Sequence, residues 1–210
     1  ISRYLLGRGA GVIVLACNTA SAAALDHLRE RFPGVPFEGM VPALKPAAAA
    51  TQTHAVGLLA TPTTLSGRLF AEVVEHHAEG VRVLTQECPG LVERVEAGDL
   101  DGPETEALLR RYVGPLVAAG ADTLVLGCTH YPFLRSSIER VAGPGVQVLD
   151  PSAAVARQVQ RVAGQGPAVG DGRRVFVSTG DPGPLQRAAR QLLGIEAEVE
   201  VVTWDHGRLG

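Results

Sequence analysis

The sequence predicts an α/β protein built around parallel β-sheets, and three observations lead to this prediction. Short apolar runs rich in valine and leucine alternate with longer segments of helical periodicity along the 210 residues. Several of these runs are continuously apolar, which is typical of parallel strands covered on both faces. The 25 glycines and 14 prolines fall mostly between the expected elements, where turns need them.

The elements follow one another in a regular order along the chain. The expected strands share a short apolar run, and they are residues 12–16, 55–59, 81–85, 123–126, 146–149, 175–178 and 199–202. The expected helices share a longer periodic or alanine-rich pattern, and they are residues 20–31, 43–51, 65–77, 104–118, 133–141, 153–162 and 184–193. Residues 1–7 are interpreted as the last turns of a helix already under way.

Composition and charge exclude several classes of protein. Hydrophobic residues make up 46% and charged residues 20% of the chain, a balance that excludes a disordered protein. The net charge of -3 gives no electrostatic reason to expect a nucleic-acid partner. The longest uncharged apolar stretch, residues 9–25, is interrupted by polar residues such as Asn18 and Ser21, so no membrane span is expected. Three cysteines are too few for a disulfide framework and favour free thiols in a reducing compartment.

Two distant segments repeat one pattern around a cysteine. Residues 15–19 (LACNT) and 126–130 (LGCTH) each combine the end of an apolar strand, a small residue, a cysteine and two hydrogen-bonding residues, and a helix follows. Ligands of α/β proteins bind at the carboxyl ends of parallel strands. If the two halves of the chain face each other, Cys17 and Cys128 point into one cleft.

A pair of facing thiols has a clear chemical use. A thiol at a helix N-terminus is expected to have a lowered pKa and to serve as a base. The free N–H groups there can also hold a substrate carboxylate, helped by Asn18, Thr19 and Thr129. One thiol can remove a proton from one face of a carbon while the other delivers a proton to the opposite face. We expect no cofactor and no metal, because the sequence has no glycine-rich dinucleotide loop, P-loop or zinc-ligand spacing.

Other interpretations of these residues stay open at this point. A single strand-end cysteine is usually a small buried hydrophobe, although the matched contexts of Cys17 and Cys128 favour a functional pair. A non-catalytic thiol redox or metal-binding protein would use the same two cysteines and His130. His130 is either an acid–base helper or an ordinary loop residue. Thr64 follows another strand end, where it either holds a carboxylate or forms a turn, and Cys88 lacks the repeated pattern and is expected to be structural.

Four motifs resemble those of the glutamate racemases, within the aspartate/glutamate racemase family. Residues 16–22 (ACNTASA) and 126–132 (LGCTHYP) resemble the two signature motifs of that family. Residues 88–98 (CPGLVERVEAG) resemble its middle motif, and residues 60–64 (ATPTT) its threonine-bearing loop. Relatives that act on aspartate or hydantoins tend to carry Glu where His130 stands, so the motif points to glutamate. A racemase of aspartate or another amino acid stays the alternative.

The resemblance implies a function and a set of site residues. It implies an isomerase that interconverts L- and D-glutamate without a cofactor, supplying D-glutamate for peptidoglycan, and hence for cell wall biogenesis and cell shape, in the bacterial cytoplasm. Cys17 would exchange the proton of D-glutamate and Cys128 that of L-glutamate. His130 would assist Cys128, and Glu96 is favoured over Glu93 for an electrostatic role. The implied substrate contacts are Asn18, Thr19, Thr64, Thr129 and His130.

The resemblance also implies a domain layout. It predicts two flavodoxin-like domains with the active site in the cleft between them, residues 1–41 and 149–210 forming one and residues 42–148 the other. The family opens with an Asp-Ser-Gly motif on its first strand and a Tyr-Gly loop, and neither is found here. We therefore expect the first domain to lack a strand–helix–strand unit and to expose an unpaired sheet edge, and we expect the 210-residue chain by itself to be weakly active or inactive. A homodimer is possible.

Overall fold

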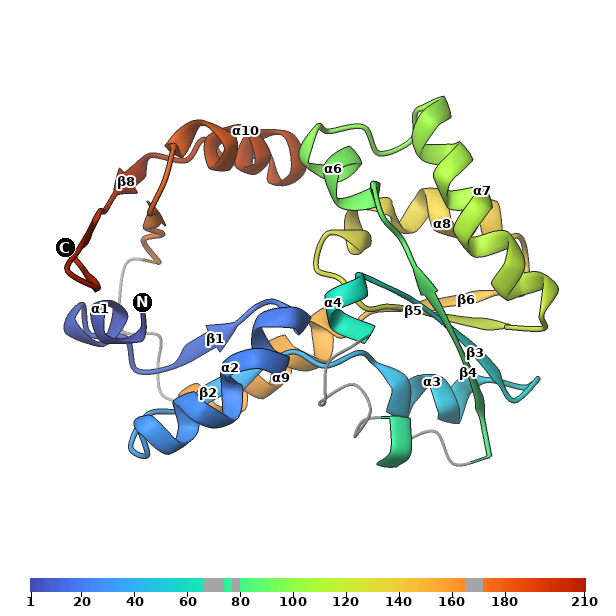
Figure 1. Ribbon diagram of the computed structural model, residues 1–210, viewed down its shortest axis with the longest axis horizontal. Helices are drawn as coiled ribbons and strands as arrows, with labels where there is room; N and C mark the ends of the chain where they lie inside the picture. Colours follow the sequence, from blue (N-terminus) through green and yellow to red (C-terminus); the bar gives the residue numbers. More distant parts are fainter. Residues whose placement is uncertain (66–73, 77–79, 165–171) are drawn as a thin grey trace.

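The computed structural model describes residues 1–65, 74–76, 80–164 and 172–210, and its largest sheet is parallel (Figure 1). Four strands lie in the order β4 (Arg82–Glu87), β3 (Ala55–Ala60), β5 (Thr123–Leu126) and β6 (Gln147–Leu149), and every pairing between neighbours is parallel. All residues of β3 and β5 are buried. The predicted α/β class with buried parallel strands is therefore confirmed.

Helices cover both faces of this sheet. Helices α7 (Pro103–Ala118) and α8 (Arg135–Ala142) pack on one face, against Leu59 and Leu124. Helix α3 (Leu44–Ala50) packs on the other face, against side chains such as Leu58. Because successive residues of a strand point to opposite faces, one continuously apolar strand supplies two separate cores.

The remaining elements form two smaller parallel pairs. Strand β1 (Ile13–Leu15) pairs with β2 (Phe37–Gly39), and α2 (Asn18–Arg31) packs on them over a small apolar core. Strand β7 (Phe176–Ser178) pairs with β8 (Val199–Val201). Within the described part of the chain these pairs are separate two-stranded sheets. Helix α9 (Ser152–Ala163) lies on β2, and α10 (Pro182–Leu193) on β7 and β8.

Most predicted elements occur close to their expected bounds, and the exceptions have local causes. The strand β2 was not predicted, because Phe-Glu-Gly is too short and too polar to show periodicity. The expected helix 133–141 begins earlier as a 3₁₀ turn, η1 (Tyr131–Leu134), before α8. The expected helix 65–77 falls largely outside the described residues, and α4 (Pro62–Leu65) precedes it. The domain boundaries at residues 41, 42, 148 and 149 stay a prediction.

Further elements of the fold also escaped prediction. They are the short helix α6 (Leu91–Glu96) and the terminal hairpin of β9 (Trp204–Asp205) and β10 (Arg208–Leu209). The helix expected to end near residue 7 is α1 (Ser2–Gly7). Of these, α6 ends at Glu96, one of the predicted site residues.

A half-buried carboxylate, Asp122, anchors the loop at residues 51–53 directly before strand β5. Its carboxylate accepts hydrogen bonds from the Thr51 hydroxyl at 2.5 Å, from the backbone N–H groups of Gln52 at 2.7 Å and Thr53 at 3.0 Å, and from the Thr123 hydroxyl at 3.1 Å. Burial works to raise the pKa of Asp122, but these hydrogen bonds outweigh it and lower the pKa to about 2.

We expect Asp122→Asn to lower the free energy of unfolding by about 1–2 kcal/mol at neutral pH, because an amide nitrogen would face backbone N–H donors. The folded-state pKa lies below the unfolded value, so the stabilisation is present above about pH 4 and is lost as the pH falls toward about 2. Urea unfolding at several pH values measures this, with exposed Asp101→Asn as the control. A deficit that stays constant down to the lowest pH would contradict the assignment.

Candidate active site

The first cysteine of the repeated pattern lies at the open end of a long helix. Cys17 is the N-cap residue of α2 and has an extended backbone, with φ -155° and ψ 125°. Among the described residues, no side chain caps this helix and no acidic residue lies in its first turn. The N-terminal N–H groups of α2 and its dipole are therefore available to an anion.

Asn18, the first residue of α2, adds a second sign of a binding site. Its side chain is 4% exposed, and neither its amide nitrogen nor its amide oxygen has a hydrogen-bond partner among the described residues. An unpaired buried amide costs free energy, so such groups in native proteins usually serve a bound ligand or water. The amide and the helix terminus together can hold a carboxylate.

The second cysteine of the pattern follows the central strand β5. Gly127 lies between β5 and Cys128, and its backbone N–H donates to the Leu59 carbonyl at 2.8 Å. A Cβ at this position would lie 2.9 Å from that same oxygen, so only glycine allows the two strands to approach this closely. The small residue of the repeated pattern therefore sets the position of Cys128.

The electrostatics of Cys128 differ from the sequence-based expectation. Burial raises the pKa of the Cys128 thiol, and the nearby Cys17 thiol raises it further, against the opposing effect of backbone N–H groups of His130, Tyr131 and Thr129. The expected lowering of the thiol pKa is wrong for Cys128, because removal from water outweighs the N–H groups.

His130 links Cys128 to a carboxylate. Its Nδ1 lies 3.7 Å from the Cys128 sulfur, and its Nε2 lies 3.3 Å from an Oε1 of Glu96, the last residue of α6. A carboxylate on Nε2 favours the tautomer with the proton there, which leaves the Nδ1 lone pair to accept the thiol proton. Glu93 lies exposed one turn earlier, and it is Glu96 that contacts the imidazole.

Two of the predicted threonines meet although they are far apart in the sequence. The hydroxyl oxygens of Thr19 on α2 and Thr64 on α4 are 3.0 Å apart, and those of Thr64 and Thr61 are also 3.0 Å apart. Thr64 is 3% exposed. This chain of hydroxyls joins α2, at the first cysteine, to the end of β3, which neighbours β5 and the second cysteine.

A cavity of about 610 Å³ lies between the contact of His130 with Glu96 and helix α10. Glu96, Thr129 and His130 line one side of it, and α10 lines the other with apolar side chains and Arg187. Neither Cys17 nor Cys128 is among the described residues that line it, so the pocket expected between the two thiols stays a prediction. Arg187 was missed by sequence reasoning, since no motif surrounds it.

Cys17, Cys88 and Cys128, all among the described residues, are free thiols. Burial raises the pKa of Cys88 to about 12, so this thiol stays protonated at neutral pH.

Within the described ranges, no group of three or more His, Cys, Asp or Glu side chains could hold a metal ion. No described helix is long and apolar enough to cross a membrane.

The sequence profile of the Asp/Glu/Hydantoin racemase family matches residues 2–159, which include both cysteines, His130 and Glu96. The chain belongs to this family.

Three comparisons place it near the glutamate racemases in particular. It is 57% identical over 159 residues to the glutamate racemase of Roseiflexus sp. (strain RS-1), covering 76% of this chain and 58% of that protein. It is 50% identical over 204 residues to that of Ectopseudomonas mendocina, covering 96% of this chain and 78% of that protein.

A solved structure agrees with the sequence comparisons. Escherichia coli glutamate racemase, crystallised with L-glutamate and the activator UDP-MurNAc-ala, superposes with a TM-score of 0.77 at 30% identity. The superposition covers 94% of this chain and 76% of that one. The likeness confirms the α/β fold class and the resemblance to the glutamate racemases.

Proposed function

We propose that the protein containing this chain racemises glutamate, with Cys17 and Cys128 as the two acid–base groups. The observation that carries this proposal is that two free cysteines each follow a strand end, while the contact between Thr19 and Thr64 brings the first turn of α2 beside the end of β3, the neighbour of the strand that leads to Cys128. Similarity to glutamate racemases over most of the chain supports the substrate.

The proposed proton transfers assign one thiol to each face of the α-carbon. Cys17, as a thiolate, removes the α-proton of D-glutamate, and the resulting carbanion takes a proton from the Cys128 thiol on its opposite face. In the reverse direction Cys128 is the base and Cys17 the acid. The raised pKa of Cys128 suits the donor role, because a partly buried thiol with a raised pKa holds its proton until a carbanion forms.

His130 and Glu96 let Cys128 also act as a base. The Nδ1 of His130 faces the Cys128 sulfur and can accept its proton, while Glu96 stabilises the imidazolium that forms. The Cys17 side has a different environment, with the N-terminus of α2 in place of an imidazole. The two half-reactions therefore have different helpers.

The substrate carboxylates have three sources of recognition. The α2 N-terminus and the unpaired Asn18 amide provide N–H donors on the Cys17 side. Thr19 and Thr64 provide hydroxyls, and Thr129 does so beside Cys128. We propose that these groups hold the glutamate carboxylates so that the α-carbon lies between the two sulfurs.

The wider role follows from the same reaction. We propose that D-glutamate made in this way supplies peptidoglycan synthesis in the bacterial cytoplasm. Because the two thiols carry both protons, the proposed reaction needs no cofactor. A homodimer is a further expectation, which light scattering of the purified protein would test.

Racemisation of aspartate or another amino acid is the second candidate function, because the matching family includes aspartate and hydantoin racemases.

The test is a racemisation assay of the full-length protein that contains this chain, in D₂O with separate enantiomers of glutamate and aspartate, followed by chiral chromatography and NMR of the α-proton. We expect inversion of both glutamate enantiomers with deuterium incorporated at the α-carbon, and little turnover of aspartate. Faster turnover of aspartate would overturn the choice of substrate. No turnover together with a disulfide or bound zinc would favour the thiol redox or metal-binding alternative.

A further inference from the structure

A turn at residues 88–90 precedes α6, the short helix that ends at Glu96. Residues 88–90 leave strand β4 and lead into α6, and Gly90, the N-cap residue, has φ +87°. Helix α6 has six residues, and among the described residues no side chain caps it. Such a short helix is not stable by itself, so its position depends on packing and on the turn before it.

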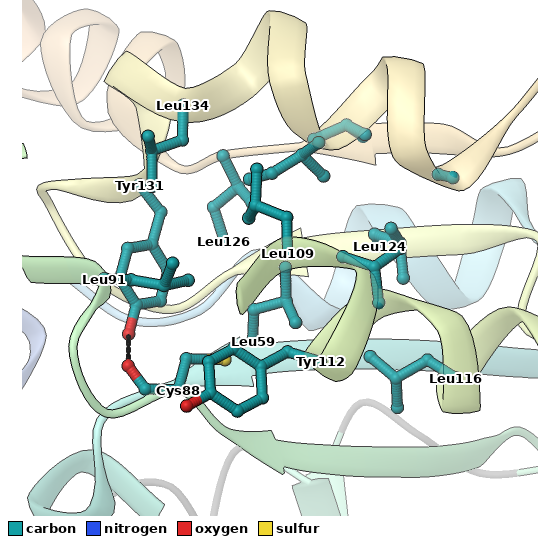
Figure 2. Close-up of a cluster of buried hydrophobic side chains, with 14 of the residues drawn as sticks. Leu59, Cys88, Leu91, Leu109, Tyr112, Leu116, Leu124, Leu126, Tyr131 and Leu134 are labelled. Carbon is teal, nitrogen blue, oxygen red and sulfur yellow. Dashed lines mark hydrogen bonds between the residues drawn. The ribbon is translucent and has the colours of Figure 1, made fainter. Parts of the chain in front are cut away.

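Two buried tyrosines donate hydrogen bonds to this turn, and Figure 2 shows the bond from Tyr131. The Tyr112 hydroxyl, from α7, donates to the Pro89 carbonyl at 2.8 Å. The Tyr131 hydroxyl, from η1, donates to the Cys88 carbonyl at 3.4 Å. Figure 2 shows Tyr131 reaching down beside Leu91 to the Cys88 carbonyl, while Tyr112 approaches Cys88 from the side.

These hydroxyls are fixed donors. Tyr112 is 4% exposed and Tyr131 is fully buried, so water cannot readily replace either of them. Burial raises the pKa of both phenols, so each keeps the proton that it donates. The bond of Tyr112 has ordinary length and that of Tyr131 is long, so Tyr112 is the stronger of the two.

The tyrosines also connect the two motifs that supply the site. Tyr131 directly follows His130 in the sequence, and its hydroxyl contacts the turn that carries α6 and Glu96. The 3.3 Å contact between Glu96 and His130 is made by an exposed carboxylate, with its side chain 64% exposed. An exposed contact of this kind has little strength to hold two elements together, so buried contacts set the approach, and the two tyrosine hydroxyls are among them, beside the core residues Leu91 and Val95 of α6.

We propose that Tyr112 and Tyr131 are positioning residues, whose hydroxyls hold the turn at residues 88–90 so that Glu96 meets His130 and His130 meets Cys128. For its effect on catalysis this inference rests on the proposed racemase function. For its effect on the Cys128 thiol it rests on the geometry alone.

The test uses Tyr112→Phe and Tyr131→Phe, which remove one oxygen each and keep the ring in the core. Tyr4→Phe is the matched control, because the Tyr4 hydroxyl is bonded to Arg8 and lies outside the site. The rates of alkylation of Cys128 and Cys17 by iodoacetamide are measured as a function of pH by peptide mass spectrometry. Circular dichroism verifies that each variant is folded.

We expect alkylation of Cys128 near neutral pH to slow about three- to tenfold in Tyr112→Phe and less in Tyr131→Phe, with the pH profile moved upward. The rate at Cys17 and both rates in Tyr4→Phe should stay unchanged. In a Glu96→Gln background the tyrosine substitutions should have no further effect on Cys128, because the contact they position is already lost.

Three outcomes would overturn the inference. They are an unchanged Cys128 profile in both folded variants, an equal change at Cys17 and Cys128, and a full additional effect in the Glu96→Gln background. The alkylation readout does not need racemisation, so a shifted Cys128 profile in a protein that turns over no amino acid would refute the proposed function and leave the positioning role standing. In an active enzyme, kcat is expected to fall with the Cys128 alkylation rate.

Discussion

Replacing either Cys17 or Cys128 by serine is expected to reduce glutamate racemisation by about a thousandfold or more, since a hydroxyl is a far weaker acid than a thiol and general acid–base catalysis is worth about 10²–10⁴. The overall fold should be retained, because both side chains are only partly buried. The racemisation rate with each enantiomer, measured by chiral chromatography, provides the test.

The two variants should differ in the proton exchange that remains. Cys17→Ser keeps the thiol that faces L-glutamate, so any residual α-deuterium incorporation should be confined to L-glutamate, and Cys128→Ser should show the reverse. Cys88→Ala is the control for loss of a thiol, and it should keep exchange in both enantiomers while losing stability, since Cys88 belongs to the core. Racemisation at the unmodified rate in either serine variant would refute the two-thiol mechanism.

Gly127→Ala is expected to reduce racemisation by about a hundredfold, because displacement of a catalytic group by about 1 Å has this order of effect. The added Cβ would lie 2.9 Å from the Leu59 carbonyl oxygen, and this main-chain atom also accepts the Gly127 N–H. The strands must therefore separate or the Cys128 backbone must move. We also expect a loss of about 1–3 kcal/mol in the free energy of unfolding.

Gly114→Ala in α7 is the matched control for this change. A Cβ at Gly114 meets no atom within 4 Å among the described residues, so the substitution should raise stability by about 0.5–1 kcal/mol through helix propensity. Activity and urea unfolding are measured for both variants. If Gly127→Ala matched the unmodified protein in rate and stability, the close approach at Gly127 would have no role in placing Cys128.

The strands and the cysteine positions could be predicted because their signals are local. The runs that became β3 and β5 are continuously apolar, and parallel strands buried on both faces need that pattern. The repeated pattern around Cys17 and Cys128 marks two strand ends, and the structure has β1 ending at Leu15 and β5 at Leu126. The strand β2 lacked such a signal, because three residues that include Glu38 and Gly39 show no period.

The pairwise contacts of the site could not be predicted from the residues themselves. The middle motif singled out Glu96, but its contact with His130 depends on where α6 packs. The meeting of Thr19 and Thr64 depends on how α2 approaches the end of β3. Tyr112 gave no functional signal, because a tyrosine on the buried face of a helix is usually a core-packing residue.

The sequence by itself determined the α/β class, the two cysteines at strand ends and the family to which the chain belongs. These features depend on the order and type of neighbouring residues, which a linear chain already contains. Only the tertiary structure decided that the Cys128 pKa is raised, that Asn18 is buried without a partner and that two tyrosine hydroxyls hold the turn before α6. Burial and long-range hydrogen bonds depend on distant segments packing together, and for Cys128 the loss of water outweighed the local helix-terminus effect.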